Sequence, residues 1–95
     1  MRYAVFSDIH SNLEALEAVV DALKAEKVER YFCAGDIVGY ASDPKPCIRM
    51  IREINCLTVC GNHDRAAVDL IDYSSLIVYA RASIDWTKTK LEDSD

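Results

Sequence analysis

Three short segments of this chain carry side chains of the types that bind metal ions. Asp8 and His10 lie two residues apart, Asp36 follows a glycine, and residues 61–64 read Gly-Asn-His-Asp. Divalent Mn, Fe and Zn ions bind carboxylate oxygen and imidazole nitrogen in proteins. The residue types therefore favour one metal site that is assembled from three separate segments.

The same residues are suited to a pair of ions and to phosphoryl chemistry. The Asp36 carboxylate has two oxygens and can bridge two ions, and the amide oxygen of Asn62 can bind the second ion. Two ions about 3.5–4 Å apart bind a phosphoryl group, generate a hydroxide nucleophile and stabilise the developing charge. His63, which precedes the carboxylate of Asp64, is placed to donate a proton to a leaving alkoxide.

Strand-like apolar runs precede these segments, and helical patterns separate the runs. Such alternation predicts an α/β fold, with a parallel sheet, right-handed crossovers and flanking helices. Because the carboxyl ends of parallel strands meet at one edge of the sheet, the three polar segments are expected to gather there. The expected strands are residues 2–7, 30–34 and 57–60, and the expected helices are residues 11–26, 43–55 and 79–91.

The first two helices have recognisable starts. Ser11 with Glu14 three residues later forms a capping-box signature, and Asn12 is expected to sit at the same helix start. Asp43 followed by Pro44 predicts an acidic N-cap with proline at the first helical position.

The composition narrows the class of protein. With 95 residues the chain is long enough for one small domain, and its net charge of −5 argues against a general nucleic-acid binder. No apolar run approaches the roughly 20 residues that span a bilayer, and the start lacks a signal-peptide pattern, so we expect a cytoplasmic protein. The four cysteines form no C-x-x-C pair and are expected to be buried thiols rather than a zinc cluster or disulfide framework.

The polar segments and their flanks resemble the calcineurin-like metallophosphoesterases. The matching text is FSDIHSNLEALEAV, FCAGDIVGYASDP, VCGNHD and the terminal YARASIDWTKTKL, which together cover nearly the whole chain. The flanks are similar to a bacterial subgroup of small phosphodiesterases and serine/threonine-phosphatase-like proteins. The resemblance implies hydrolysis of phosphomonoesters or phosphodiesters and the N-terminal half of a four-layer sandwich.

The resemblance also implies two divalent metal ions, drawn from Mn, Fe, Zn, Co or Ni. Asp8 and His10 would bind the first ion, Asp36 would bridge both ions, and Asn62 would bind the second.

Two further residues acquire roles from the same resemblance. His63 would act as the acid or transition-state stabiliser near the leaving group, and Asp64 would tune or orient His63. Apart from the resemblance, Arg65 is a candidate to reach a substrate phosphate, with a solvated side chain as the alternative. Tyr40 is a candidate to line the cleft mouth, with ordinary packing as the alternative.

The chain departs from the family pattern in its number of histidines. Family members also use histidines from a C-terminal half, including a Gly-His-x-His motif, whereas this chain has only His10 and His63. We therefore expect residues 1–95 to be an incomplete metallophosphoesterase domain. An inactive truncated member that acts only by interaction is the alternative function.

A three-stranded sheet with an open edge also predicts marginal stability or self-association. An aspartyl-phosphate transferase of the Asp-x-Asp type fits less well, because position 10 is His.

Overall fold

The centre of the fold is a sheet of three parallel strands. The computed structural model describes residues 1–69, 72–74, 76–92 and 95. The strands lie in the order β1-β2-β3, and their bounds are Tyr3–Phe6, Arg30–Cys33 and Leu57–Thr58. This arrangement confirms the expected parallel sheet, although β3 is shorter than the run at 57–60 that was expected to form it.

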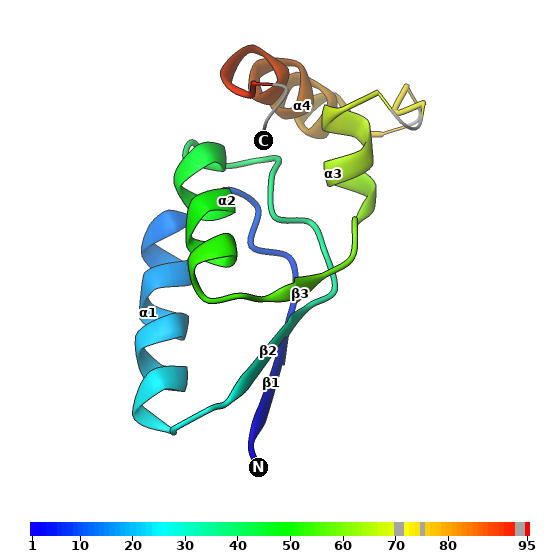
Figure 1. The fold of residues 1–95 in the computed structure, drawn as a ribbon. Helices are drawn as coiled ribbons and strands as arrows, with labels where there is room; N and C mark the ends of the chain where they lie inside the picture. Colours follow the sequence, from blue (N-terminus) through cyan, green and yellow to red (C-terminus); the bar gives the residue numbers. More distant parts are fainter. Residues whose placement is uncertain (70–71, 75, 93–94) are drawn as a thin grey trace.

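Two helices connect these strands and lie side by side on one face of the sheet (Figure 1). They are α1, Leu13–Ala25, and α2, Pro44–Glu53. The buried cluster between helices and sheet contains Leu16, Val20, Cys47 and Ile51, against which Phe6 and other partly buried side chains pack. Each large apolar side chain buried in this way contributes about 1.5–3 kcal/mol. The α/β fold with flanking helices is thus held by the apolar faces of α1 and α2.

Helix α1 begins later than the capping-box signature predicted. Asn12 is the N-cap residue, and its side chain accepts a hydrogen bond from the Ala15 backbone N–H at 3.1 Å. Ser11 is instead buried, and its backbone N–H donates to the carbonyl of Ile37 at 2.8 Å. The expected Ser11 cap is therefore wrong, because Ser11 joins the neighbouring loop and leaves the capping position to Asn12.

Helix α2 begins as its sequence predicted, with Asp43 at the N-cap position and Pro44 at the first helical position. The Asp43 side chain makes no capping hydrogen bond, so the proline and the packing of Cys47 and Ile51 account for this helix start. The helix ends at Glu53, two residues before the expected end.

The chain turns into helices directly after β3. Gly61 is the N-cap of α3, Asn62–Ala67, which is followed by α4, Val78–Lys90. The segment 61–64 therefore forms the start of a helix. In Figure 1 both helices lie beyond the carboxyl ends of the strands. Among the described residues, no helix is both long enough and apolar enough to cross a bilayer.

The sheet face opposite α1 and α2 is exposed. Ala4 is buried and Phe6 packs against the core, so their alternating neighbours Tyr3 and Val5 point to the other face. Val5 is 76% exposed, and Leu57 on β3 is 62% exposed. The described residues therefore leave an apolar sheet surface uncovered.

Candidate metal centre

The loops that follow β1 and β2 are joined by backbone hydrogen bonds. The N–H of Asp8 donates to the carbonyl of Gly35 at 3.0 Å, and the N–H of His10 donates to the carbonyl of Asp36 at 2.9 Å. These bonds extend the pairing of β1 and β2 past the ends of the strands. They hold two of the three sequence segments side by side at the carboxyl edge of the sheet, where the sequence predicted them.

Asp8, His10 and Asp36 form a group of potential metal ligands. One donor atom from each lies within 4.8 Å of the donor atoms of the other two. The Nε2 atom of His10 lies 3.2 Å from Oδ1 of Asp8. The hydroxyl of Ser7 donates to Oδ2 of Asp8 at 2.6 Å and is the main cause that lowers the Asp8 pKa. The arrangement keeps the Asp8 carboxylate ionised, which is the form that binds a cation.

All three residues have left-handed backbone conformations. The φ angle is +59° at Asp8, +48° at His10 and +55° at Asp36. Such angles cost about 1–3 kcal/mol each for a residue with a side chain, and the surrounding structure must hold them in place. The hydrogen bonds between the two loops supply part of that support. The same conformation also occurs after helices α1 and α2, at Lys27 and Asn55, so it supports the site only together with the donor atoms described above.

The third segment meets the other two through Asp36. Oδ1 of Asp36 accepts a hydrogen bond from the backbone N–H of His63 at 2.9 Å. Gly61 lies so close that an added Cβ would stand 2.2 Å from the same oxygen. Only glycine allows this approach of the loop before α3 to the Asp36 carboxylate.

His63 is buried beside His10. The centroids of the two imidazole rings are 4.7 Å apart, and Nδ1 of His63 has no hydrogen-bond partner among the described residues. A Cβ at Gly39 would come within 2.3 Å of this Nδ1, so the Gly39 backbone covers that side of the ring. Burial is the main cause that lowers the His63 pKa, and the neighbouring His10 lowers it further. The neutral imidazole is therefore the favoured form.

The carboxylate of Asp64 binds the backbone rather than the His63 ring. Oδ1 accepts from the N–H groups of Ile37 at 2.8 Å and Val38 at 3.1 Å, and Oδ2 accepts from the N–H of Gly61 at 3.1 Å. Asp64 thus joins the 37–38 loop to the start of α3, the helix that carries His63. Its charge raises the His63 pKa, though more weakly than burial lowers it. The expected role of Asp64 in tuning or orienting His63 stays a prediction.

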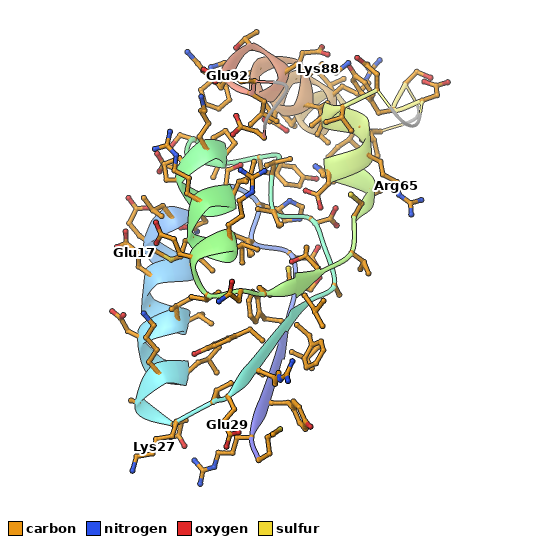
Figure 2. All side chains as sticks on the ribbon, viewed as in Figure 1. Glu17, Lys27, Glu29, Arg65, Lys88 and Glu92 are labelled. Carbon is orange, nitrogen blue, oxygen red and sulfur yellow. The ribbon has the colours of Figure 1, made fainter. Side chains whose placement is uncertain are left out.

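The two remaining candidates lie on α3 and are exposed. Asn62 is the first residue of the helix, directly before His63. Arg65 extends outward from α3, away from the helix and the neighbouring elements in Figure 2. The structure thus brings Asp8, His10, Asp36 and His63 together and leaves Arg65 in solvent.

Tyr40 contacts the site more closely than its sequence position indicated. Its ring centroid lies 5.0 Å from that of His10 and 4.8 Å from that of His63. The only sequence signal was an aromatic residue that follows Gly39 in the loop after the second polar segment. That signal left cleft lining and ordinary packing as alternatives.

Comparisons with known proteins show which family and which fold this chain is similar to. The profile of the calcineurin-like phosphoesterase superfamily domain matches residues 1–92. An uncharacterized protein of Methanocaldococcus jannaschii is 45% identical over 94 residues, which are 97% of this chain and 38% of that protein. A crystal structure of a metallophosphoesterase from Sphaerobacter thermophilus superposes with a TM-score of 0.78 at 36% identity and covers 99% of this chain. This chain spans 38% of the length of that structure as well.

Proposed function

Because this chain belongs to the calcineurin-like phosphoesterase superfamily, we propose that it carries part of the active site of a metal-dependent phosphoesterase. The substrates would be phosphomonoesters or phosphodiesters. The observation that carries the proposal is the group of donor atoms from Asp8, His10 and Asp36 within 4.8 Å of one another. The chain spans 38% of the length of the relative and of the solved structure, so the activity proposed is that of a whole protein containing this sequence.

The chemistry of these donors fits divalent transition-metal ions. Two carboxylates and an imidazole are ligands that Mn, Fe, Zn, Co and Ni accept. In this proposal Asp8 and His10 hold one ion, Asp36 bridges two, and Asn62 supplies an amide oxygen to the second. Bound ions would supply Lewis acidity and lower the pKa of water at the site. Dependence of the activity on added Mn or a similar transition metal belongs to the same proposal, and so does the cytoplasmic location expected from the sequence.

His63 is the residue we propose to act on the leaving group. Its neutral imidazole retains one N–H, which can donate to an oxygen on which negative charge develops. Burial favours this use, because a hydrogen bond is electrostatically stronger where water is excluded. The backbone bond from His63 to Asp36 fixes the start of α3 close to the ligand group. Asp64 supports the same position through Gly61.

The test uses the protein encoded by the complete reading frame that contains this sequence. Hydrolysis of p-nitrophenyl phosphate and bis-p-nitrophenyl phosphate is measured with a panel of Mn, Fe, Zn, Co and Ni, and again after chelation with EDTA. We expect activity that requires an added ion and that distinguishes monoester from diester. Undiminished hydrolysis in metal-stripped protein would overturn the metal-dependent mechanism. Absence of hydrolysis with every ion would favour the alternative of an inactive member that acts by interaction.

A further inference from the structure

Tyr40 and the two histidines form a contiguous group of three rings. The Tyr40 and His10 rings meet edge to face at 80°, and the Tyr40 and His63 rings are tilted by 36°. The His10 and His63 rings complete the group with centroids 4.7 Å apart. Tyr40 is 51% exposed, so one part of its ring contacts both imidazoles while another part reaches solvent.

The backbone of Tyr40 is held from a distant helix. Its N–H donates to the hydroxyl of Ser83 on α4 at 3.0 Å, across 43 residues of sequence. The Ser83 hydroxyl in turn donates to the carbonyl of Ala80 at 2.8 Å, which fixes its direction. The φ angle of Tyr40 is +62°, a conformation that a bulky residue adopts only where the structure holds it. Ser83 provides one such restraint.

The two imidazoles differ in how they are oriented. His10 has polar contacts on both ring nitrogens, with the Val38 carbonyl 3.1 Å from Nδ1 and Asp8 near Nε2. Nδ1 of His63, by contrast, is buried with no hydrogen-bond partner among the described residues. The direction of the His63 ring therefore depends on the groups packed around it. Those groups include Tyr40 and His10.

We propose that Tyr40 is a positioning residue, which keeps the His63 imidazole oriented against His10 and is itself held by Ser83 of α4. A ring at position 40 fills the space beside both imidazoles, whereas a small side chain would leave His63 free to change rotamer. The hydroxyl of Tyr40 has no part in this role. The kinetic consequence rests on the function proposed above, but the orientation of the ring does not.

The first test measures ring orientation without any reaction. The zinc-loaded full-length protein is labelled with 13C-histidine, and the His10 and His63 signals are assigned with His10→Gln and His63→Gln variants. Nuclear Overhauser effects between the ring protons of His10 and His63 report the orientation of the two imidazoles, and Tyr40→Ala should weaken them. Tyr40→Phe should leave these effects near their original strength. Tyr79→Ala removes a tyrosine that is 81% exposed on α4 and serves as the matched control.

The Ser83 link is tested in the same spectra. Ser83→Ala should weaken the effects between the His10 and His63 rings, as Tyr40→Ala does, because Tyr40 loses its restraint. Thr89→Ala is the control, since Thr89 also bonds a carbonyl three residues earlier on α4 and is exposed. Unchanged effects between the two imidazole rings in Tyr40→Ala would overturn the proposal. Effects that weaken in Tyr40→Ala but not in Ser83→Ala would overturn the role of Ser83.

The second test separates positioning from substrate contact by kinetics on bis-p-nitrophenyl phosphate. Tyr40→Ala should lower kcat by about 10- to 100-fold with little change in KM, which is the scale of a misplaced catalytic group. Tyr40→Phe should restore kcat. A raised KM with unchanged kcat, or equal losses in both variants, would contradict a positioning role for the ring. If the unmodified protein hydrolyses nothing, the proposed function fails, and the spectra still decide the orientation of His63.

Discussion

Asp36 and His63 are joined by a hydrogen bond of 2.9 Å from the His63 backbone N–H to the Asp36 carboxylate, across 27 residues of sequence. Asp36 also belongs to the group of potential metal ligands with Asp8 and His10. The same side chain therefore supports the backbone of the residue proposed to act on the leaving group and takes part in the proposed metal site. Changes at Asp36 should affect both, whereas changes to the His63 imidazole should leave the ligand group in place.

We first predict that His63→Ala and Asp36→Ala separate rate from metal content in the full-length protein. His63→Ala should lower kcat by about 10²–10⁴-fold and retain bound metal, because it removes only an acid or charge-stabilising group. Asp36→Ala should lose metal, because a bridging carboxylate serves both ions. Metal content measured by inductively coupled plasma mass spectrometry, beside kcat, checks both. The reverse pattern would show that the two roles are wrongly assigned.

A second prediction concerns the close approach of Gly61 to Asp36. In Gly61→Ala the new Cβ would stand 2.2 Å from Oδ1 of Asp36, so the loop or the carboxylate must move. We expect weaker metal binding and a lower unfolding temperature, both measured on the full-length protein. Ser42→Ala changes an exposed residue in the loop before α2, and this control should alter neither. Unchanged metal affinity in Gly61→Ala would contradict the close packing of these loops.

Asp64→Asn gives a third prediction, on stability. The asparagine oxygen can still accept from the 37–38 loop, but its amide group cannot accept the N–H of Gly61, which then loses its partner. An unsatisfied, part-buried N–H costs about 1–3 kcal/mol. Urea denaturation should show a loss of this size in the free energy of unfolding of Asp64→Asn. Asp21→Asn, at an exposed position on α1, should show little loss. If both variants unfold at the same urea concentration, Asp64 does not support the loops.

A fourth prediction concerns thiol reactivity. Cys47 is fully buried in the core, and burial raises its pKa to about 11, whereas Cys60 is exposed. The thiolate is the reactive form, so at pH 8 a maleimide should label Cys60 rapidly and Cys47 only after unfolding. Mass spectrometry of the digested protein distinguishes the sites. As a control, labelling of the protein unfolded in about 8 M urea should reach all four cysteines.

The raised Cys47 pKa also sets the sign of a pH effect on stability. An unfolded Cys47 thiol loses its proton near the ordinary value of 9.0, whereas the folded protein retains the proton until about pH 11. Between these values the unfolded state binds fewer protons, so the contribution of Cys47 to the free energy of unfolding falls as pH rises. Cys47→Ala should remove this part of the decrease in the free energy of unfolding at alkaline pH. An identical pH profile in the variant would contradict the assigned cause.

The fifth prediction concerns the exposed sheet face of the isolated 95-residue chain. Tyr3 and Val5 on β1 and Leu57 and Val59 on the β3 side leave apolar surface in water. Such a surface favours association of copies, so the sedimentation coefficient should rise with protein concentration. Val5→Lys should suppress the rise, whereas Val19→Lys on α1 should not. A monomer at all concentrations in the unmodified chain would refute this expectation.

The alternation of strands and helices was readable from the sequence, because it depends on the spacing of apolar residues within each segment. The position of the polar segments after the strands followed from the same pattern. Parallel strands place their carboxyl ends on one edge, and the structure brings Asp8, His10, Asp36 and His63 together there. The start of α2 at Asp43 and Pro44 could also be predicted from the sequence, because proline fixes its own backbone in a conformation suited to the first turn of a helix.

Local signals failed where a distant partner competed for the same residue. Ser11 carries a capping signature, but its bond to Ile37 draws it into the interior, and Asn12 caps α1 instead. Asp64 follows His63 in the sequence, yet its carboxylate accepts hydrogen bonds from three backbone N–H groups.

The contact of Tyr40 with two histidines, and its restraint by Ser83, were decided only by the tertiary structure. No periodicity within one segment carries information about a hydrogen bond across 43 residues, because that bond depends on how α4 packs beyond the carboxyl ends of the strands. The sequence by itself determined which side chains could hold a metal. Packing between segments determined how the imidazole of His63 is held beside them.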